Sequence, residues 1–314
     1  MLQKVKYAVR EICKNYNNSS WLHNRVQYRI NSPVQQILRP PSSIKNILDH
    51  DWGTLIIIDA CRADLFAEVA AESDLFSHWQ EMRSVASSTP EWLQRTFEES
   101  HGEIVYVAGN AMVSQHRKNC FHELIESWRE GYDPDTSIIA PKQVTKDALQ
   151  AFEKYPNKRL IIHYVQPHYP FIDYPELQYA KLSFDPIFES VHSENEFHDV
   201  WEALEAGDVS KALVWEGYKH NLEVVVDEVK KLIHKIDDKI VLTSDHGNML
   251  GGRSWPFPIK TYGHPGYLRI KDLIKVPYCA FDGKRKKIVN GGVNSNDSVD
   301  AEGIRQRLRD LGYQ

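Results

Sequence analysis

Acidic and imidazole side chains stand where short apolar runs of this sequence end. Asp59 closes the run TLIIID, and Asp245 and His246 follow the run KIVLT. Carboxylates and imidazoles without a thiolate are typical ligands of Zn, Mn, Ca or Mg. Taken singly, Asp59 also fits a helix cap and the Asp-His-Gly stretch also fits a turn. Their shared place at the ends of apolar runs favours a divalent metal site.

Three more histidines lie in or near such runs. His163 stands inside RLIIHYV, His168 follows it in QPHYPF, and His264 lies in the glycine- and proline-rich stretch YGHPGY. A histidine inside an apolar run also fits a hydrogen-bonded core residue. Because His163 and His168 mark the end of a third run, we keep all three histidines as candidate site residues.

Two hydroxyl residues precede a strong helix start. In SSTPEW, Ser88 and Thr89 come directly before Pro90 and Glu91, which predicts a helix beginning there. One interpretation is a plain N-cap. The other is a nucleophile at the positive end of a helix, where an anion is stabilised. Such a hydroxyl needs a base or a metal at neutral pH, and the cluster around Asp59 and Asp245 would supply one.

The elements that must position these residues alternate between strands and helices. Apolar runs predict strands at 54–59, 103–109, 159–165, 239–245 and 275–281. Helices are expected near 62–71, 119–129, 142–154 and 208–236. This alternation predicts an α/β fold with a mostly parallel sheet and helices on both faces. In such sheets ligands bind at the carboxyl ends of the strands.

The order of these pieces resembles the alkaline phosphatase superfamily, in particular its sulfatase-like branch, over residues 53–280. IIIDACRAD is similar to the family's opening strand, and LTSDHGNMLG to its late segment with an Asp and a His. The resemblance implies an alkaline phosphatase-like fold and metal ligands at Asp59, Asp245 and His246. QPHYPF is similar to the segment whose histidine, here His168, contacts the transferred group.

The nucleophile segment departs from the sulfatase pattern Cys-x-Pro-Ser-Arg, whose cysteine becomes a formylglycine. Alignment on Pro90 places Ser88 at the cysteine and Thr89 at x, while Glu91 and Trp92 replace Ser-Arg. An unmodified hydroxyl, as in the phosphatase and phosphotransferase branches, fits better. We expect Ser88 to be the nucleophile, with Thr89 as the alternative.

The remaining candidates have two roles each. His264, with His168 or His163, either binds a second metal or hydrogen-bonds substrate oxygens. Arg62 either assists electrostatically or, with Asp64, anchors the start of the following helix.

The expected function is a metal-dependent hydrolase or transferase of a phosphate mono- or diester. The alternatives are a sulfate-ester hydrolase and a catalytically silent metal-binding scaffold. A small-molecule, glycan or lipid-headgroup ester is the expected substrate, and the metal is Zn, Mn, Ca or Mg. The sequence leaves the oligomeric state open.

Charge divides the 314 residues into two parts. Residues 1–48 carry eight Lys or Arg against Glu11 alone, although the whole chain has a net charge of -5. We expect a basic helix and wrapping arm over 1–50 and one catalytic domain over 51–314. The arm is either solvated or in peripheral contact with an anionic surface. The mild net charge gives no indication of a nucleic acid partner.

The cysteine pattern and the apolar runs bear on location. The four cysteines form no CxxC pair, which is typical of reduced thiols. Residues 1–17 predict an amphipathic helix without the apolar core of a signal peptide, and no run approaches membrane-spanning length. We therefore expect a cytoplasmic protein, at most peripheral to a membrane.

Overall fold

The structure is a computed structural model that describes residues 10, 11, 15, 19–179, 197, 199–284 and 286–293. The helix predicted over 1–17 therefore lies outside the described residues, apart from three of its positions.

The centre of the fold is a seven-stranded sheet with the order β2-β11-β8-β1-β7-β3-β4. Its strands are β1 (Thr54–Asp59), β2 (Gln80–Arg83), β3 (His101–Ala108), β4 (Phe121–Ile125), β7 (Arg159–Pro167), β8 (Ile240–Thr243) and β11 (Lys275–Phe281). Among these described strands β11 runs opposite to the other six. The predicted mostly parallel sheet is confirmed.

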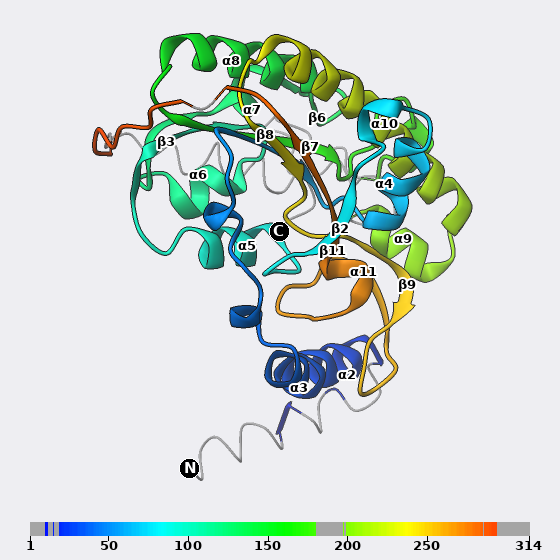
Figure 1. Ribbon diagram of the computed structural model, residues 1–314. Helices are drawn as coiled ribbons and strands as arrows, with labels where there is room; N and C mark the ends of the chain where they lie inside the picture. Colours follow the sequence, from blue (N-terminus) through cyan, green and yellow to red (C-terminus); the bar gives the residue numbers. More distant parts are fainter. Residues whose placement is uncertain are drawn as a thin grey trace, which may run out of the picture.

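The central strands are apolar because both faces of the sheet are covered. All six residues of β1 are buried, as are all four of β8. Helices α8 (Pro141–Lys154) and α10 (Lys211–Lys235) pack against β7 on one face. Helices α5 (Thr89–Thr96) and α6 (Met112–Arg117) lie on the other face (Figure 1).

The remaining elements are short. They are the helices α4 (Ala63–Ala70), α7 (Ser127–Glu130), α9 (Val200–Ala206) and α11 (Lys271–Ile274), the 3-10 turns η2 (Pro41–Ser43), η3 (Ile47–Asp49), η4 (Asp74–Phe76) and η5 (Pro175–Leu177), and the strand pairs β5 (Tyr132–Asp133) with β6 (Ile138–Ile139) and β9 (Met249–Arg253) with β10 (Lys260–Gly263).

The prediction of a helix near 119–129 is wrong. The chain there forms the edge strand β4 and then the single turn α7, and α6 ends before it at Arg117. Phe121 is buried and the next four residues of β4 are half-buried, as expected for an edge strand. A run of this length fits a half-buried strand as well as a helix.

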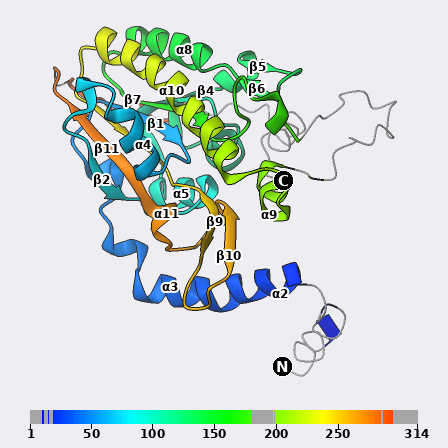
Figure 2. The ribbon, with the colours of Figure 1, turned by 90° about the vertical axis from the view of Figure 1, so that its right-hand side faces the viewer.

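The segment that precedes the sheet is helical rather than an irregular arm. Helix α2 (Ser19–Val26), the π-helical turn η1 (Gln27–Asn31) and α3 (Ser32–Leu38) follow one another without a break. Pro33 falls in the first turn of α3, directly after the π-turn. Because a proline has no N–H, it removes one backbone hydrogen bond of the helix, which fits the change of hydrogen-bond pattern at this point. We call residues 19–38 the arm helix. It lies along the base of the molecule beside β9 and β10 (Figure 2).

No helix among the described residues combines the length and the apolar character needed to cross a bilayer.

Candidate metal centre and nucleophile

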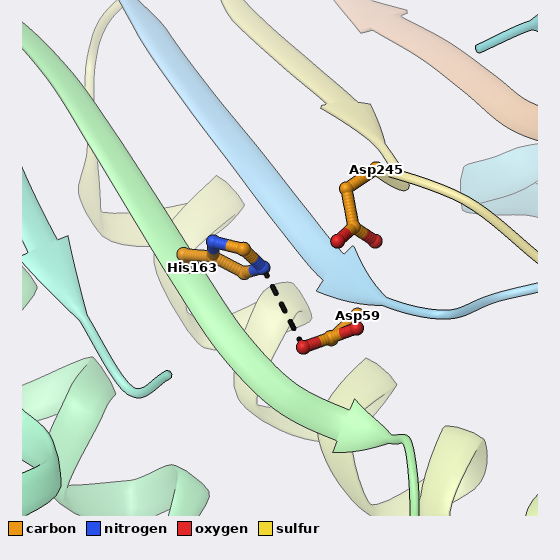
Figure 3. Close-up of side chains that lie close together, drawn as sticks. All are labelled: Asp59, His163 and Asp245. Atoms are coloured by element: carbon orange, nitrogen blue, oxygen red, sulfur yellow. Dashed lines mark ion pairs between the residues drawn. The ribbon is translucent and has the colours of Figure 1, made fainter. Parts of the chain in front are cut away.

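Three strands bring Asp59, His163 and Asp245 together (Figure 3). In β1, Ile57 pairs with His163 of β7 on one side and with Thr243 of β8 on the other. Asp59 lies two residues after Ile57, and Asp245 two residues after Thr243. Side chains two positions apart share one face of a sheet, so all three point the same way. One ligand atom from each lies within 4.8 Å of the others.

The backbone at the end of β1 is held in an uncommon conformation. The register of β1 against β7 shifts between Ile58 and Asp59, and Ala60 has a φ of +58°. Two contacts fix this residue: its N–H donates to Asp245 Oδ1 at 3.0 Å, and its carbonyl accepts from the Tyr218 hydroxyl. Strain at one residue, held by its surroundings, is a common feature of functional sites.

Asp245 is a fully buried carboxylate surrounded by donors. Its Oδ1 accepts from the N–H groups of Ala60 and His246, and its Oδ2 accepts from the Thr89 hydroxyl. Burial alone would raise the pKa of Asp245. The nearby imidazoles of His246 and His163, with these hydrogen bonds, outweigh burial and hold the pKa below its ordinary value. Asp245 is therefore an ionised carboxylate in the core.

His246 presents its Nε2 atom to both carboxylates. Its Nδ1 donates to the Gly247 carbonyl at 2.7 Å, since a carbonyl only accepts. A neutral ring then carries a lone pair on Nε2. This atom lies 3.6 Å from Asp59 Oδ1 and 3.4 Å from Asp245 Oδ2. A lone pair facing two carboxylates is the arrangement of a ligand set.

His163 also presents a ring nitrogen to the site. Its Nδ1 lies 2.8 Å from the Tyr106 hydroxyl. Its Nε2 is buried, lies 3.9 Å from Asp59 Oδ2 and has no hydrogen-bond partner among the described residues. Burial, above all, lowers the pKa of His163 to about 4, so the ring is neutral at pH 7. An orphaned imidazole nitrogen beside two carboxylates fits a divalent metal.

Thr89 is the hydroxyl that reaches this cluster. It opens α5, and its Oγ1 lies 2.8 Å from Asp245 Oδ2, 3.2 Å from His246 Nε2 and 3.4 Å from Asp59 Oδ1. Ser88 is the N-cap of the same helix but makes no side-chain cap bond, and no hydrogen bond joins it to the cluster. Its Oγ instead faces Gly266. The structure therefore brings together Thr89, not the favoured Ser88, with the predicted metal ligands.

His168 and His264 form a pair next to the cluster. Their Nε2 atoms are 2.7 Å apart, and the ring of His264 lies 4.8 Å from that of His246. His168 Nδ1 donates to the Tyr169 carbonyl, so its Nε2 is the acceptor in a neutral pair. Burial lowers the pKa of His168 to about 4. His264 also lines a cavity of about 310 Å³ between the arm helix, α9 and β10.

Arg62 lies apart from the carboxylate cluster. Its guanidinium forms ion pairs with Asp64 and Asp272 and donates to the Asn248 carbonyl at 3.0 Å. It also lies over the Trp215 ring. These contacts hold the start of α4 against the segment that follows Asp245. They agree with the second role that the sequence allowed for Arg62, which was to anchor the start of this helix.

Sequence reasoning missed two residues of the site. Asn110 donates its side-chain amide to Asp59 Oδ2, and Tyr106 holds His163. Both belong to β3 or to the turn just after it. The sequence predicted this strand at 103–109. Because ligands gather at the carboxyl ends of parallel strands, a search just beyond residue 109 would have found Asn110.

The residues fit a divalent metal. The donor set is two buried carboxylates and two imidazole nitrogens without a thiolate, and one of these nitrogens is orphaned. This is an oxygen- and nitrogen-rich set of the kind that Zn or Mn accepts. The chain is thus an α/β protein with a candidate metal centre at the carboxyl edge of its sheet.

No model of a protein family matches this sequence, and no curated protein matches it either. Solved structures of other proteins are similar, among them the following three. The soluble domain of lipooligosaccharide phosphoethanolamine transferase A from Neisseria meningitidis is 13% identical, with a TM-score of 0.42, over 72% of this chain and 75% of that chain. The C-terminal periplasmic domain of EptC from Escherichia coli is 13% identical, with a TM-score of 0.44, over 77% and 75%.

The third is a protein in the alkaline phosphatase superfamily from Vibrio parahaemolyticus, 13% identical with a TM-score of 0.37, over 77% of this chain and 62% of that chain.

Proposed function

We propose that this protein is a metal-dependent enzyme that cleaves a phosphate ester, with Thr89 as its nucleophile. One observation carries the proposal: the Thr89 hydroxyl lies within 3.2 Å of both Asp245 Oδ2 and His246 Nε2, at the start of a helix. A hydroxyl so placed has an acceptor for its proton and a positive helix end for its developing charge.

Asp59, Asp245 and His246 would hold a divalent ion, with His163 as a further ligand. Such an ion lowers the pKa of a hydroxyl and neutralises charge on a phosphoryl oxygen. Asn110 and the Ala60 N–H keep the two carboxylates oriented, and orientation of ligands by their partners is what tunes a metal site.

The reaction proceeds in two displacements. Thr89 Oγ1 attacks phosphorus, an O–P bond to Thr89 forms, and the P–O bond to the alcohol of the substrate breaks. The hydroxyl proton of Thr89 passes to the Asp245 carboxylate and on to the departing alkoxide, which leaves as the alcohol. Water or an acceptor alcohol then attacks the same phosphorus, the bond between Thr89 Oγ1 and phosphorus breaks, and the proton of the attacking O–H passes through Asp245 to Thr89 Oγ1.

His168 and His264 would hold oxygens of the transferred group. His168 is buried and His264 is partly buried, the His264 ring lies between those of His168 and His246, and desolvation keeps both rings neutral. In the neutral pair each N–H is already donated, that of His168 to the Tyr169 carbonyl and that of His264 to His168, so binding a substrate oxygen would require the two rings to separate. The cavity that His264 lines is where the rest of the ester would lie.

An ester screen tests the proposal. Wild type, Thr89→Ala and Ser88→Ala are assayed on a phosphate monoester, a phosphodiester and a sulfate ester with Zn, Mn, Mg and Ca. We expect turnover of a phosphate ester, reduced at least about a thousandfold in Thr89→Ala and retained in Ser88→Ala. Turnover of the sulfate ester alone would favour the sulfatase alternative, and metal binding without any turnover the scaffold.

The natural ester is a small molecule, a glycan or a lipid headgroup. The cytoplasmic location expected from the sequence stays a prediction, which cell fractionation would test.

A further inference from the structure

The arm helix buries its polar side and exposes its apolar side. Among residues 21–38, whose burial the structure describes, the buried side chains are all polar: Gln27, Asn31, Ser32 and Gln35. Surface helices of globular proteins show the opposite pattern, because their apolar stripe faces the core. The apolar side of this helix therefore faces away from the protein that it packs on.

The buried polar side is fixed by hydrogen bonds to the loops around β9 and β10. Asn31 bonds both the N–H and the carbonyl of Phe257, and Gln35 donates to the Trp255 carbonyl. Ser32 donates to the Tyr267 carbonyl at 2.8 Å. These hydrogen bonds fix the rotation of the arm helix about its own axis. Because its polar side is held against the loops, its apolar side faces outward.

Exposed apolar side chains gather at this one place. Of the nine large apolar residues exposed in the described chain, seven lie on the arm helix or on the loops bonded to it. Ile37 and Leu38 are the most exposed, at 77% and 65%. Leu22, Ile30 and Ile37 are about two helical turns apart and share one side of the helix. We call Leu22, Ile30, Ile37, Leu38 and the adjacent Phe257 the apolar face.

The charged side chains of the arm helix itself are positive, and the acidic side chains Asp199, Glu202 and Glu205 line the cavity beside residues 23–28. Residues 12–48 contain no acidic residue. Arg29 is exposed, Arg39 stacks over Trp255, and the adjoining strands add Arg253 and Lys260. Exposed apolar side chains flanked by arginine, lysine and tryptophan match an anionic lipid surface: the apolar groups enter the acyl boundary and the cations meet the headgroups.

We propose that the apolar face of the arm helix binds peripherally to an anionic membrane surface. This goes beyond the proposed function and does not depend on the chemistry at Thr89. The arm helix also lines the cavity that contains His264. A membrane bound to the arm would therefore lie beside that cavity.

Flotation with vesicles tests the proposal on the full chain. The vesicles are phosphatidylcholine alone, or phosphatidylcholine mixed with phosphatidylglycerol. The key variant is Ile37→Ser with Leu38→Ser. Its matched control is Ile288→Ser with Val289→Ser, which removes two exposed apolar side chains away from the arm.

Wild type and control are expected to float with the anionic vesicles, less at high salt. The arm variant should show a partition coefficient at least about tenfold lower, and Arg29→Gln one roughly fivefold lower. Circular dichroism melting checks that each variant folds. Because both apolar residues are highly exposed, the fold should be unaffected.

Three results would overturn the proposal. The first is wild-type protein that stays unbound with anionic vesicles. The second is an equal loss of binding in the control variant. The third is a wild-type dimer that the arm variant converts to a monomer in sedimentation equilibrium, which would assign the apolar face to a second copy of the chain.

Discussion

Thr89 Oγ1 and Asp245 Oδ2 lie 2.8 Å apart, and both side chains are fully buried. A buried hydroxyl bonded to a buried carboxylate costs more to desolvate than an apolar pair. A plain N-cap would not need this arrangement, because an N-cap hydroxyl bonds the backbone of its own helix. The contact instead joins the start of α5 to the carboxyl end of β8, where the other candidate ligands lie.

Divalent metal is expected to stabilise the folded protein. An ion that binds only the folded state adds about 2.7 kcal/mol at a free concentration about a hundred times its dissociation constant. Urea unfolding with and without Zn or Mn measures this gain. Asp245→Asn should abolish it. Asp64→Asn, whose carboxylate pairs with Arg62 instead, should keep it. An equal gain in wild type and Asp245→Asn would place the metal elsewhere.

Tyr106→Phe should weaken metal binding without disrupting the fold. The hydroxyl orients His163 through Nδ1, and loss of such a partner typically costs about tenfold or more in affinity. Titration calorimetry measures it. The matched control is Tyr164→Phe, whose buried hydroxyl bonds Thr145 at 2.8 Å.

Both tyrosine variants lose one buried hydrogen bond, worth about 1 kcal/mol. Tyr106→Phe alone should lower the metal affinity. Equal metal affinities in the two variants would show that His163 is a core histidine rather than a ligand.

Glu91 is expected to hold the nucleophile segment against the loop after His264. Its buried carboxylate accepts from the N–H of Ser87 and of Tyr267 and forms an ion pair with buried Arg269 at 3.2 Å. Removing one partner of a buried pair costs about 3–5 kcal/mol, so Glu91→Gln should lower the free energy of unfolding by that order.

Arg95→Gln is the control for Glu91. Arg95 bonds the same carboxylate at 2.8 Å but is partly exposed, so its loss should cost less than about 1 kcal/mol. Urea unfolding compares the two variants. Similar losses in both would mean that the Glu91–Arg269 pair contributes little.

Arg62 should matter for stability and not for chemistry. Its contacts are Asp64, Asp272 and the Asn248 carbonyl. Arg62→Gln is therefore expected to lower the free energy of unfolding by about 1–3 kcal/mol and to leave kcat within about twofold. A large fall in kcat with an unchanged free energy of unfolding would show instead that Arg62 assists the reaction electrostatically.

Much of the site could be predicted because strand ends are easy to locate. Asp59 and Asp245 stand at the ends of apolar runs and His163 stands inside one, and parallel strands place their carboxyl ends at one edge. The choice between Ser88 and Thr89 could not be made in this way. The two are adjacent, and only the angle at which α5 meets the sheet decides which hydroxyl points at Asp245.

Other features were hidden for different reasons. β2 is mostly exposed, so its short run QEMR lacks an apolar pattern. The arm helix was not expected from the sequence because Pro33, Pro40 and Pro41 suggested breaks in this part of the chain. Its inverted polarity depends on partners more than 200 residues away in the chain, such as Phe257 for Asn31. Local sequence patterns carry no information about partners so distant.

The most direct test of the central claim is intact-protein mass spectrometry after quenching the metal-loaded enzyme during turnover of a phosphate ester, followed by peptide mapping. The account predicts a phosphoryl-type adduct on Thr89, present in Ser88→Ala and absent in Thr89→Ala. An adduct on Ser88, or turnover that survives in Thr89→Ala, would contradict it.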